Sequence, residues 1–202
     1  MIVWGGTLDV GGRYSPSSNS WLSVSASEGC PTPRWNHTAV WTGSAMIVWG
    51  GSFENTGGKY DPRTDTWTPT STGENCPPGR RNHTAVWTGH EMIIWGGYPL
   101  APLKGDGGKY DPATDTWKAV STAEHCPDAR EGHTAVWSGT EMIVWGSSRE
   151  SNSGGRYDPI SDAWLPIFRG PSNRHEHSAI WTGAEMILWG GRKTLGDFII
   201  RC

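Results

Sequence analysis

A motif that recurs along this 202-residue chain limits what the chain can fold into. Its second half, MIVWGG, also occurs alone at residues 1–6. The tryptophan that ends the apolar half falls at positions 4, 49, 95, 145 and 189. A period of roughly 45 residues is typical of one propeller blade or of one helical-hairpin repeat. The full copies are HTAVWTGSAMIVWGG (37–51), HTAVWTGHEMIIWGG (83–97), HTAVWSGTEMIVWGS (133–147) and HSAIWTGAEMILWGG (177–191).

The residue types within the motif favour strands over helices. The runs AVW and MIVW are short, rich in β-branched and aromatic residues, and bounded by glycine. We expect four strands in each unit: residues 37–41 and 46–49, then one strand that carries Tyr60 and one that carries Trp67. Gly43 suits the tight turn between the first two strands. Because residues 46–49 are all apolar, both faces of that strand need cover, and sheets stacked around an axis supply it.

Fixed and variable spacings divide each unit into a core and a surface. A tyrosine and a tryptophan stand seven residues apart in every copy, which predicts one hairpin register: Tyr14 and Trp21, Tyr60 and Trp67, Tyr110 and Trp117, Tyr157 and Trp164. The segments after the second strands differ in length and composition, at residues 7–12, 52–58, 98–108 and 147–155. Variation confined to one loop per repeat marks a solvent-facing surface and often the binding face.

These features together resemble the kelch repeat, in its bacterial form, over nearly the whole chain. The residues that carry the resemblance are the double glycine after an apolar strand, the Tyr–Trp spacing and lead-ins such as PPGRRNH (77–83). It implies an all-β fold, a β-propeller with four-stranded blades whose first strand is innermost. Two departures are Gly146-Ser147 in place of a double glycine and a last copy without the Tyr and Trp. The Asp box of sialidases is rejected, because Pro62 and Thr64 occupy its Asp and Gly positions.

The repeat count predicts a single propeller of about four blades plus one extra strand. Its units are residues 1–45, 46–91, 92–141 and 142–185, with a partial unit at 186–202. Closed kelch propellers usually have more blades, so we interpret the chain as part of a longer propeller or as a shortened gene product. In an alternative arrangement, strand 177–181 completes a blade with residues 1–24 and closes a four-bladed ring. An unclosed end would expose sheet edges and favour association.

Composition excludes some partners and leaves the compartment open. The net charge is −3 and no basic run occurs, so neither nucleic acid nor an anionic membrane surface is expected as a partner. No apolar run reaches the roughly 18 residues of a membrane span, and no signal peptide is visible. A secreted or periplasmic location remains compatible with a piece of a longer chain. We interpret Cys30, Cys76 and Cys126 as packing residues that are too far apart for disulfides.

Arginine and histidine recur in register just before each first strand. The arginines are Arg34, Arg80, Arg130 and Arg174, and the histidines are His37, His83, His133 and His177. The loop into the first strand and the loop after the second should lie on one face, so these side chains are expected to rim the channel mouth. Converging guanidinium groups suit carboxylate, sulfate or phosphate ligands. In the structural alternative, each side chain holds its own loop by hydrogen bonds to backbone carbonyls.

Catalytic motifs for nucleophile, zinc or phosphate chemistry are missing from the sequence. We therefore predict no catalytic residue, metal or cofactor, and a binding or scaffolding module for a protein, peptide or other anionic ligand. By resemblance its site is the channel mouth, where Tyr98 and Phe53 are exposed aromatic candidates beside the arginines and histidines. The alternative is a carbohydrate-active enzyme, a mutarotase or lyase acting on an anionic sugar. A third interpretation gives this segment no autonomous function.

Overall fold

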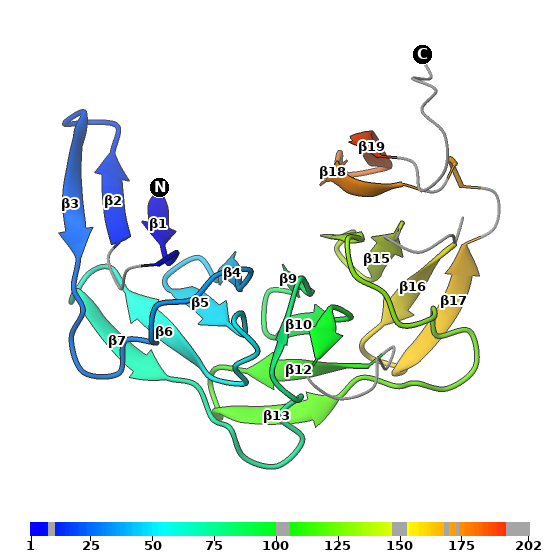
Figure 1. Cartoon of the computed structure of the whole chain (residues 1–202), viewed down its shortest axis with the longest axis horizontal. Coiled ribbons are helices and arrows are strands. Elements are labelled where there is room, and N and C mark those ends of the chain that lie inside the picture. Colours follow the sequence, from blue (N-terminus) through cyan, green and yellow to red (C-terminus); the bar gives the residue numbers. More distant parts are fainter. Residues whose placement is uncertain (8–10, 100–105, 147–152, 168–169, 173, 193–202) are drawn as a thin grey trace.

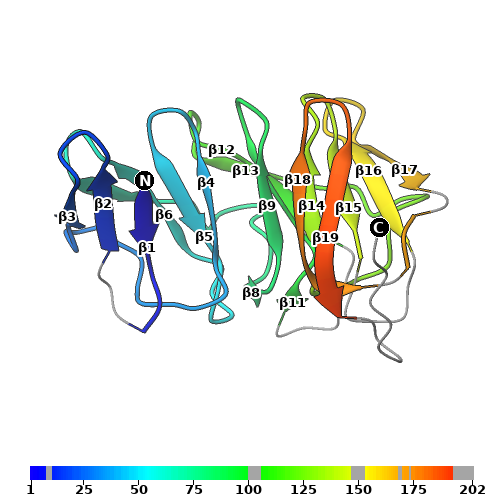
Figure 2. The same cartoon turned by 90° about the horizontal axis from the view of Figure 1, so that it is seen from above.

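The structure is a computed structural model that describes residues 1–7, 11–99, 106–146, 153–167, 170–172 and 174–192. Its regular elements are β-strands, and its main sheets follow one another around an open arc (Figure 1). The first strands β4, β9, β14 and β18 lie side by side along the inner side of this arc (Figure 2). We number the sheets as blades 1 to 5 in chain order.

Blades 2, 3 and 4 are four-stranded antiparallel sheets, whereas blade 1 has three strands and blade 5 has two. Blade 1 contains β1 (Ile2–Trp4), β2 (Gly11–Ser15) and β3 (Ser20–Val24). Blade 2 contains β4 (Thr38–Trp41), β5 (Met46–Trp49), β6 (Gly57–Asp61) and β7 (Thr66–Pro69). Blade 3 contains β9 (Thr84–Trp87), β10 (Met92–Trp95), β12 (Gly107–Asp111) and β13 (Thr116–Ala119). Blade 4 contains β14 (Thr134–Trp137), β15 (Met142–Trp145), β16 (Gly154–Asp158) and β17 (Ala163–Ile167), and blade 5 contains β18 (His175–Trp181) and β19 (Met186–Arg192).

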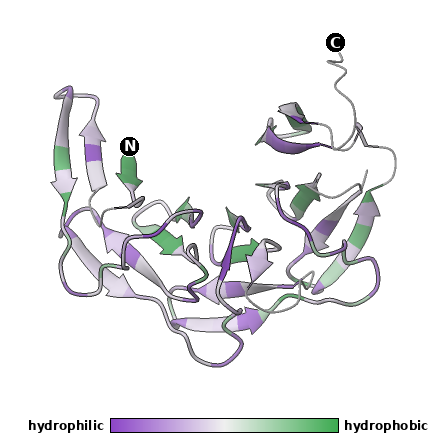
Figure 3. Ribbon diagram, in the orientation of Figure 1, coloured by the Kyte–Doolittle hydropathy of each residue, from purple (hydrophilic) through white to green (hydrophobic). Residues whose placement is uncertain are grey.

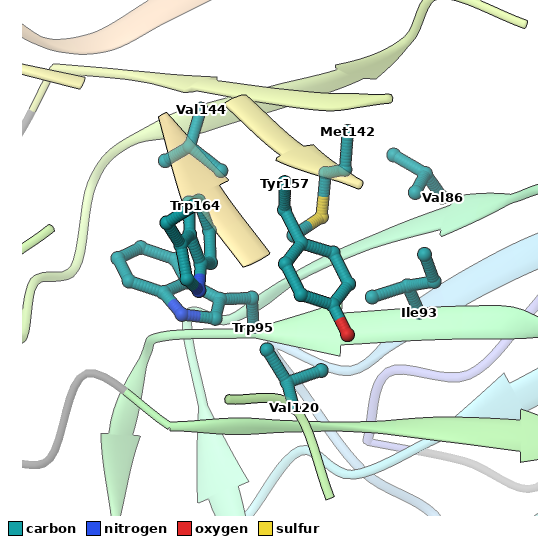
Figure 4. Close-up of a cluster of buried hydrophobic side chains, with 8 residues drawn as sticks. All are labelled: Val86, Ile93, Trp95, Val120, Met142, Val144, Tyr157 and Trp164. Carbon is teal, nitrogen blue, oxygen red and sulfur yellow. The ribbon is translucent and has the colours of Figure 1, made fainter. Parts of the chain in front are cut away.

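The core lies between blades, and the alternation of side chains along the second strand builds it. In β5, Ile47 and Trp49 pack toward blade 3, while Met46 and Val48 pack toward blade 1. The same alternation in β10 and β15 gives the cluster between blades 3 and 4 (Figure 4). Figure 3 shows the apolar colour concentrated on these second strands. The second strand is therefore covered on both faces, as its composition requires.

The outer strands of blades 2, 3 and 4 also contact the blade before them, each through its tryptophan. Trp117 of β13 packs against Trp49 of blade 2, with ring centroids 5.4 Å apart. Its indole N–H donates a hydrogen bond of 2.9 Å to the carbonyl of Ser71, which follows the last strand of blade 2. The equivalent indoles of Trp67 and Trp164 donate in the same way to Ser25 and Ser121. One repeated side chain thus supplies both apolar contact and a polar link between blades.

The first residue of the double glycine must lack a side chain, because a histidine of the next blade packs directly against it. Gly50 has φ +67, and a Cβ there would lie 2.6 Å from Cε1 of His83. Gly96 has φ +66, and a Cβ there would lie 2.7 Å from Cε1 of His133. Any side chain would therefore be strained by the backbone and would collide with an imidazole of the next blade.

The structure confirms the predicted blades and their register. Each tyrosine of the third strand lies opposite the tryptophan of the fourth, as in Tyr60 and Trp67. Gly43 adopts the expected positive φ of 101 in the turn before β5. Residues 147–152 of the fourth unit, which include Ser147, lie outside the described residues.

Two expectations about the strands need correction. The alternative closed four-bladed ring is wrong: within the described part of the chain, β18 pairs with β19, β1 pairs with β2, and the two ends of the arc stay apart (Figure 1). Repeat counting also missed two short strands, β8 (Arg80–Arg81) and β11 (Tyr98–Pro99), which form a small separate sheet. They lie in segments that the repeat pattern treats as loops.

We expect Trp95→Ala to lower the free energy of unfolding by about 3–5 kcal/mol, because it empties a fully buried indole site between blades 3 and 4. The matched control is Trp41→Ala, which removes a half-exposed indole and should cost less than about 1 kcal/mol. Urea unfolding of both variants measures the difference. Equal costs would contradict a core located between the blades.

Candidate functional site

The arginines predicted to rim the mouth are buried, or partly buried in the case of Arg174, and hold the loops of their own blades. Arg34 donates from Nη1 to the carbonyls of Gly50 (3.2 Å) and Thr56 (2.8 Å). Its Nε donates to the Thr32 carbonyl at 2.8 Å, and its Nη2 lies 3.0 Å from the hydroxyls of Thr32 and Thr56. Burial lowers the pKa of Arg34 from its ordinary value, but these acceptors satisfy the whole guanidinium group.

The other copies repeat this arrangement with small differences. Arg80 and Arg130 are buried and donate to the carbonyls of Gly96 (2.9 Å) and Gly146 (3.2 Å). Arg80 also forms an ion pair of 2.9 Å with Asp106. Arg174 is only partly buried and donates to the Gly190 carbonyl at 3.2 Å. The guanidinium groups therefore fix the lead-in to the loop after the second strand, and direct ligand contact by them stays a prediction.

The histidines link adjacent blades. Nε2 of His83 lies 2.8 Å from the Thr38 hydroxyl of the preceding blade, and its ring packs edge-on against Trp49. His133 and His177 make the same contacts to the hydroxyls of Thr84 (2.9 Å) and Thr134 (2.8 Å). His37 is partly buried and packs edge-on against Trp4. These imidazoles lie between sheets and connect neighbouring blades, and this structural role does not depend on a ligand.

Burial controls the protonation of the central histidines. It lowers the pKa of His83 to about 3 and that of His133 to about 3, with smaller contributions from Arg80 and Arg130 respectively. Burial also lowers the pKa of His37 and His177. At neutral pH these rings are uncharged.

A different group of side chains gathers at the same end of the blades. Trp35, Phe53, Arg81 and Tyr98 form what we call the Arg81 patch. The Cζ atom of Arg81 lies 4.8 Å from the ring centroid of Phe53, 5.3 Å from that of Trp35 and 5.6 Å from that of Tyr98. Trp35 is 44% exposed and Tyr98 is 39% exposed. The two residues predicted as exposed aromatic candidates, Tyr98 and Phe53, therefore belong to one cluster.

Local backbone structure brings the patch together. Strands β8 and β11 pair Arg81 directly with Tyr98, at the rim seen in Figure 2. On the other side, the Ser52 amide donates to the Trp35 carbonyl at 3.0 Å, which holds the loop of Phe53 against the lead-in of blade 2. Phe53 itself has φ 64, an uncommon conformation for an aromatic residue. The lead-ins and the loops after the second strands thus lie together, as the repeat pattern predicted.

Sequence reasoning missed Arg81 and Trp35 as site residues. Both follow the repeated arginine directly, at a position where the copies differ: Trp35, Arg81, Glu131 and His175. The arginine directly before it and the histidine two positions after it occur in all four copies, where they hold the fold together. A varying residue between two structural ones is the signal that could have located the patch.

The remaining candidates give no second site. Cys30, Cys76 and Cys126 each pack partly buried against one of the clusters between blades, as predicted. Burial raises the pKa of Cys76 and Cys126 to about 11. Asp61 accepts a hydrogen bond of 2.8 Å from the Arg63 amide, which caps the hairpin turn. No group of three or more His, Cys, Asp or Glu side chains suited to a metal occurs in the described part of the chain.

An open arc of stacked antiparallel blades, linked to one another through Trp and His, defines a propeller-type repeat protein. The chain belongs to the kelch-repeat family: residues 1–191 match the family described as the KLHDC2/KLHL20/DRC7 Kelch-repeats domain. No curated protein matches the chain. The family match gives no support to a carbohydrate partner. Within the described residues, no helix has the length and hydropathy needed to cross a bilayer.

We expect Arg130→Ala to lower the free energy of unfolding by about 3 kcal/mol, because it leaves the carbonyls of Gly146 and Ser153 without their charged donor. The control Arg63→Ala removes an exposed guanidinium paired with Asp61 and should cost less than about 0.5 kcal/mol. Urea unfolding provides the comparison. A cost below about 1 kcal/mol for Arg130→Ala would contradict the loop-holding role.

Stability should fall as the pH is lowered from 7 to 5. The pKa of His83 and of His133 is depressed in the folded state, so the unfolded chain binds protons first, below its ordinary pKa of about 6.5. This stabilisation is complete above about pH 6.5 and is lost as the pH falls toward 3, at about 2 kcal/mol for each histidine by pH 5. Carboxylates contribute little in this window, because their unfolded-state pKa values of about 4 lie below it, and Asp65, whose pKa is lowered by its hydrogen bond from Tyr60, also stays ionised in the folded state.

Urea unfolding at pH 7 and pH 5 tests this linkage. His83→Gln should remove about 2 kcal/mol of the pH dependence. His90→Gln, at an exposed position, serves as the control and should leave the pH dependence unchanged. An unaltered pH dependence in His83→Gln would show that other groups cause it.

Proposed function

We propose that this chain is a protein-binding module that recognises a partner segment at the loop-bearing end of its blades, with the Arg81 patch at the centre of the contact. The observation that carries the proposal is the position of the Arg81 guanidinium among three aromatic rings, two of which are substantially exposed. Membership of the kelch-repeat family supports it, since kelch domains generally mediate protein interactions.

The composition of the patch suits a protein or peptide ligand. Tryptophan, tyrosine and arginine are the residues most enriched among those that dominate binding energy at protein interfaces. Rings held in contact with one another lose little conformational freedom on binding. The ring centroids of Trp35 and Phe53 lie 6.4 Å apart, and those of Phe53 and Tyr98 lie 6.2 Å apart, with both pairs in edge-to-face contact. The aromatic surface is therefore organised before a partner binds.

Arg81 indicates the charge of the ligand. A guanidinium stacked on aromatic rings keeps its in-plane N–H groups available for a carboxylate. A partner segment that carries an acidic side chain beside an apolar one would satisfy the guanidinium and cover the rings.

The repeated arginines and histidines support this site by positioning its loops. Arg34 fixes the loop of Phe53 to the lead-in that bears Trp35, and Arg80 fixes the loop after β10 to the lead-in that bears Arg81. Arg34, Arg80, Arg130 and Arg174 then act on ligand affinity through the loops rather than through a ring of exposed charge.

A random peptide library displayed on phage and selected on the wild-type chain tests the proposal. We expect enrichment of sequences with an acidic residue next to an aromatic or aliphatic one. A synthetic peptide from that selection should bind at least about tenfold more weakly to Arg81→Ala and to Tyr98→Ala, as measured by fluorescence polarisation, because each change removes a central contact.

Arg63→Ala is the matched control, since it removes an exposed arginine on a hairpin turn outside the patch. It should leave the affinity unchanged. Peptides that bind Arg81→Ala as tightly as the wild type, or a selection that enriches no sequence, would contradict the proposal.

A further inference from the structure

The Arg81 patch has a carboxylate at its edge that the proposed function does not use. Glu131 occupies in blade 4 the position that Arg81 occupies in blade 3, directly after the repeated arginine. The first strands of these two blades, β9 and β14, lie side by side (Figure 2). Glu131 is partly exposed and is therefore within reach of a ligand.

A side-chain hydrogen bond joins Glu131 to the lead-in of blade 3. Nδ2 of Asn82 donates to Oε2 of Glu131 at 2.9 Å, and Asn82 directly follows Arg81. The donor is a neutral amide and contacts only one carboxylate oxygen, so the negative charge is not compensated. Among the residues that the structure describes, neither Glu131 nor Arg81 forms an ion pair.

A backbone hydrogen bond places the lead-in of blade 4 beside Tyr98. The amide of Gly97 donates to the Arg130 carbonyl at 2.8 Å, and the residues that follow these two are Tyr98 and Glu131. Tyr98 is in turn paired with Arg81 in the small sheet of β8 and β11. Glu131 therefore borders the Arg81 patch on the side of blade 4.

Opposite charges at neighbouring positions restrict which ligands fit. A segment with acidic groups alone is attracted by Arg81 and repelled by Glu131, whereas a segment that carries both signs of charge satisfies both side chains. An extended chain rises about 3.3 Å per residue, so residues within a few positions of each other can supply the two charges.

We propose that Glu131 determines the specificity of this site by selecting partner segments in which a lysine or arginine lies within a few positions of the acidic residue. The inference rests on the proposed function and names the chemistry of its partner. The Arg81 guanidinium binds the acidic side chain, the aromatic rings cover the apolar one, and the Glu131 carboxylate binds the basic one.

Glutamine at position 131 separates this role from a purely structural one. The side-chain oxygen of Gln can still accept the hydrogen bond from Asn82, so the two lead-ins stay linked, but it carries no charge. A change in ligand preference in Glu131→Gln therefore reports the loss of the charge and not the loss of the link.

A double-mutant cycle between the chain and a synthetic peptide from the phage selection tests the inference by fluorescence polarisation. Replacing the basic residue of the peptide by alanine should weaken binding to the wild-type chain by about five- to tenfold, and to Glu131→Gln by less than about twofold. Replacing the acidic residue of the peptide should weaken binding to both proteins by the same factor, because both keep Arg81.

Glu54→Gln is the matched control, since Glu54 is an exposed carboxylate that follows Phe53 in the loop of blade 2. It should discriminate between the two peptides as the wild-type chain does. Loss of discrimination in Glu54→Gln but not in Glu131→Gln would overturn the assignment. The peptide replacement needs no protein variant, so a loss below about twofold on the wild-type chain also overturns it.

Failure of this inference and failure of the proposed function are separate results. Selected peptides that depend on Arg81 but lack a basic residue, or whose basic residue contributes equally to binding of the wild-type chain and of Glu131→Gln, would overturn the inference and leave the binding site in place. A selection that enriches no sequence would contradict the proposed function, and this inference with it.

Discussion

The contact between neighbouring blades is the interaction on which the rest of this structure depends. Each blade is a thin sheet whose second strand is apolar on both faces, so it gains stability only when a blade covers each side. Tryptophan fills the largest part of that contact, and the threonine–histidine pair aligns the inner strands. The pKa depression of His83 and His133 follows from the same burial.

The stacking also explains where variation is tolerated. Arginine and histidine of the lead-in are used inside the fold, one to hold a loop and the other to link two blades. The residue directly after the arginine has neither task and differs in every copy. Binding residues can therefore change there without cost to the core, and the Arg81 patch occupies that position in blades 2 and 3.

Much of the fold was predictable because one sequence motif is repeated along the chain. Blade composition, the Tyr–Trp register and the common end for lead-ins and second-strand loops all followed from spacing. Closure was not predictable, because strand pairing between distant ends depends on the curvature that the stacked blades produce. The burial of Arg34 and Arg80 was equally hidden, since the sequence does not say whether a guanidinium faces carbonyls or solvent.

The sequence by itself predicted a stack of kelch-type blades, because its repeat resembles the kelch repeat and because a strand such as MIVW needs cover on both faces. Tertiary structure alone decided which side chains remain for partners. It turned the repeated arginines inward and gathered Trp35, Phe53, Arg81 and Tyr98 from four separate segments. Those outcomes depend on the distances between loops of different blades and on the curvature of the arc. Neither can be predicted from the sequence of a single repeat.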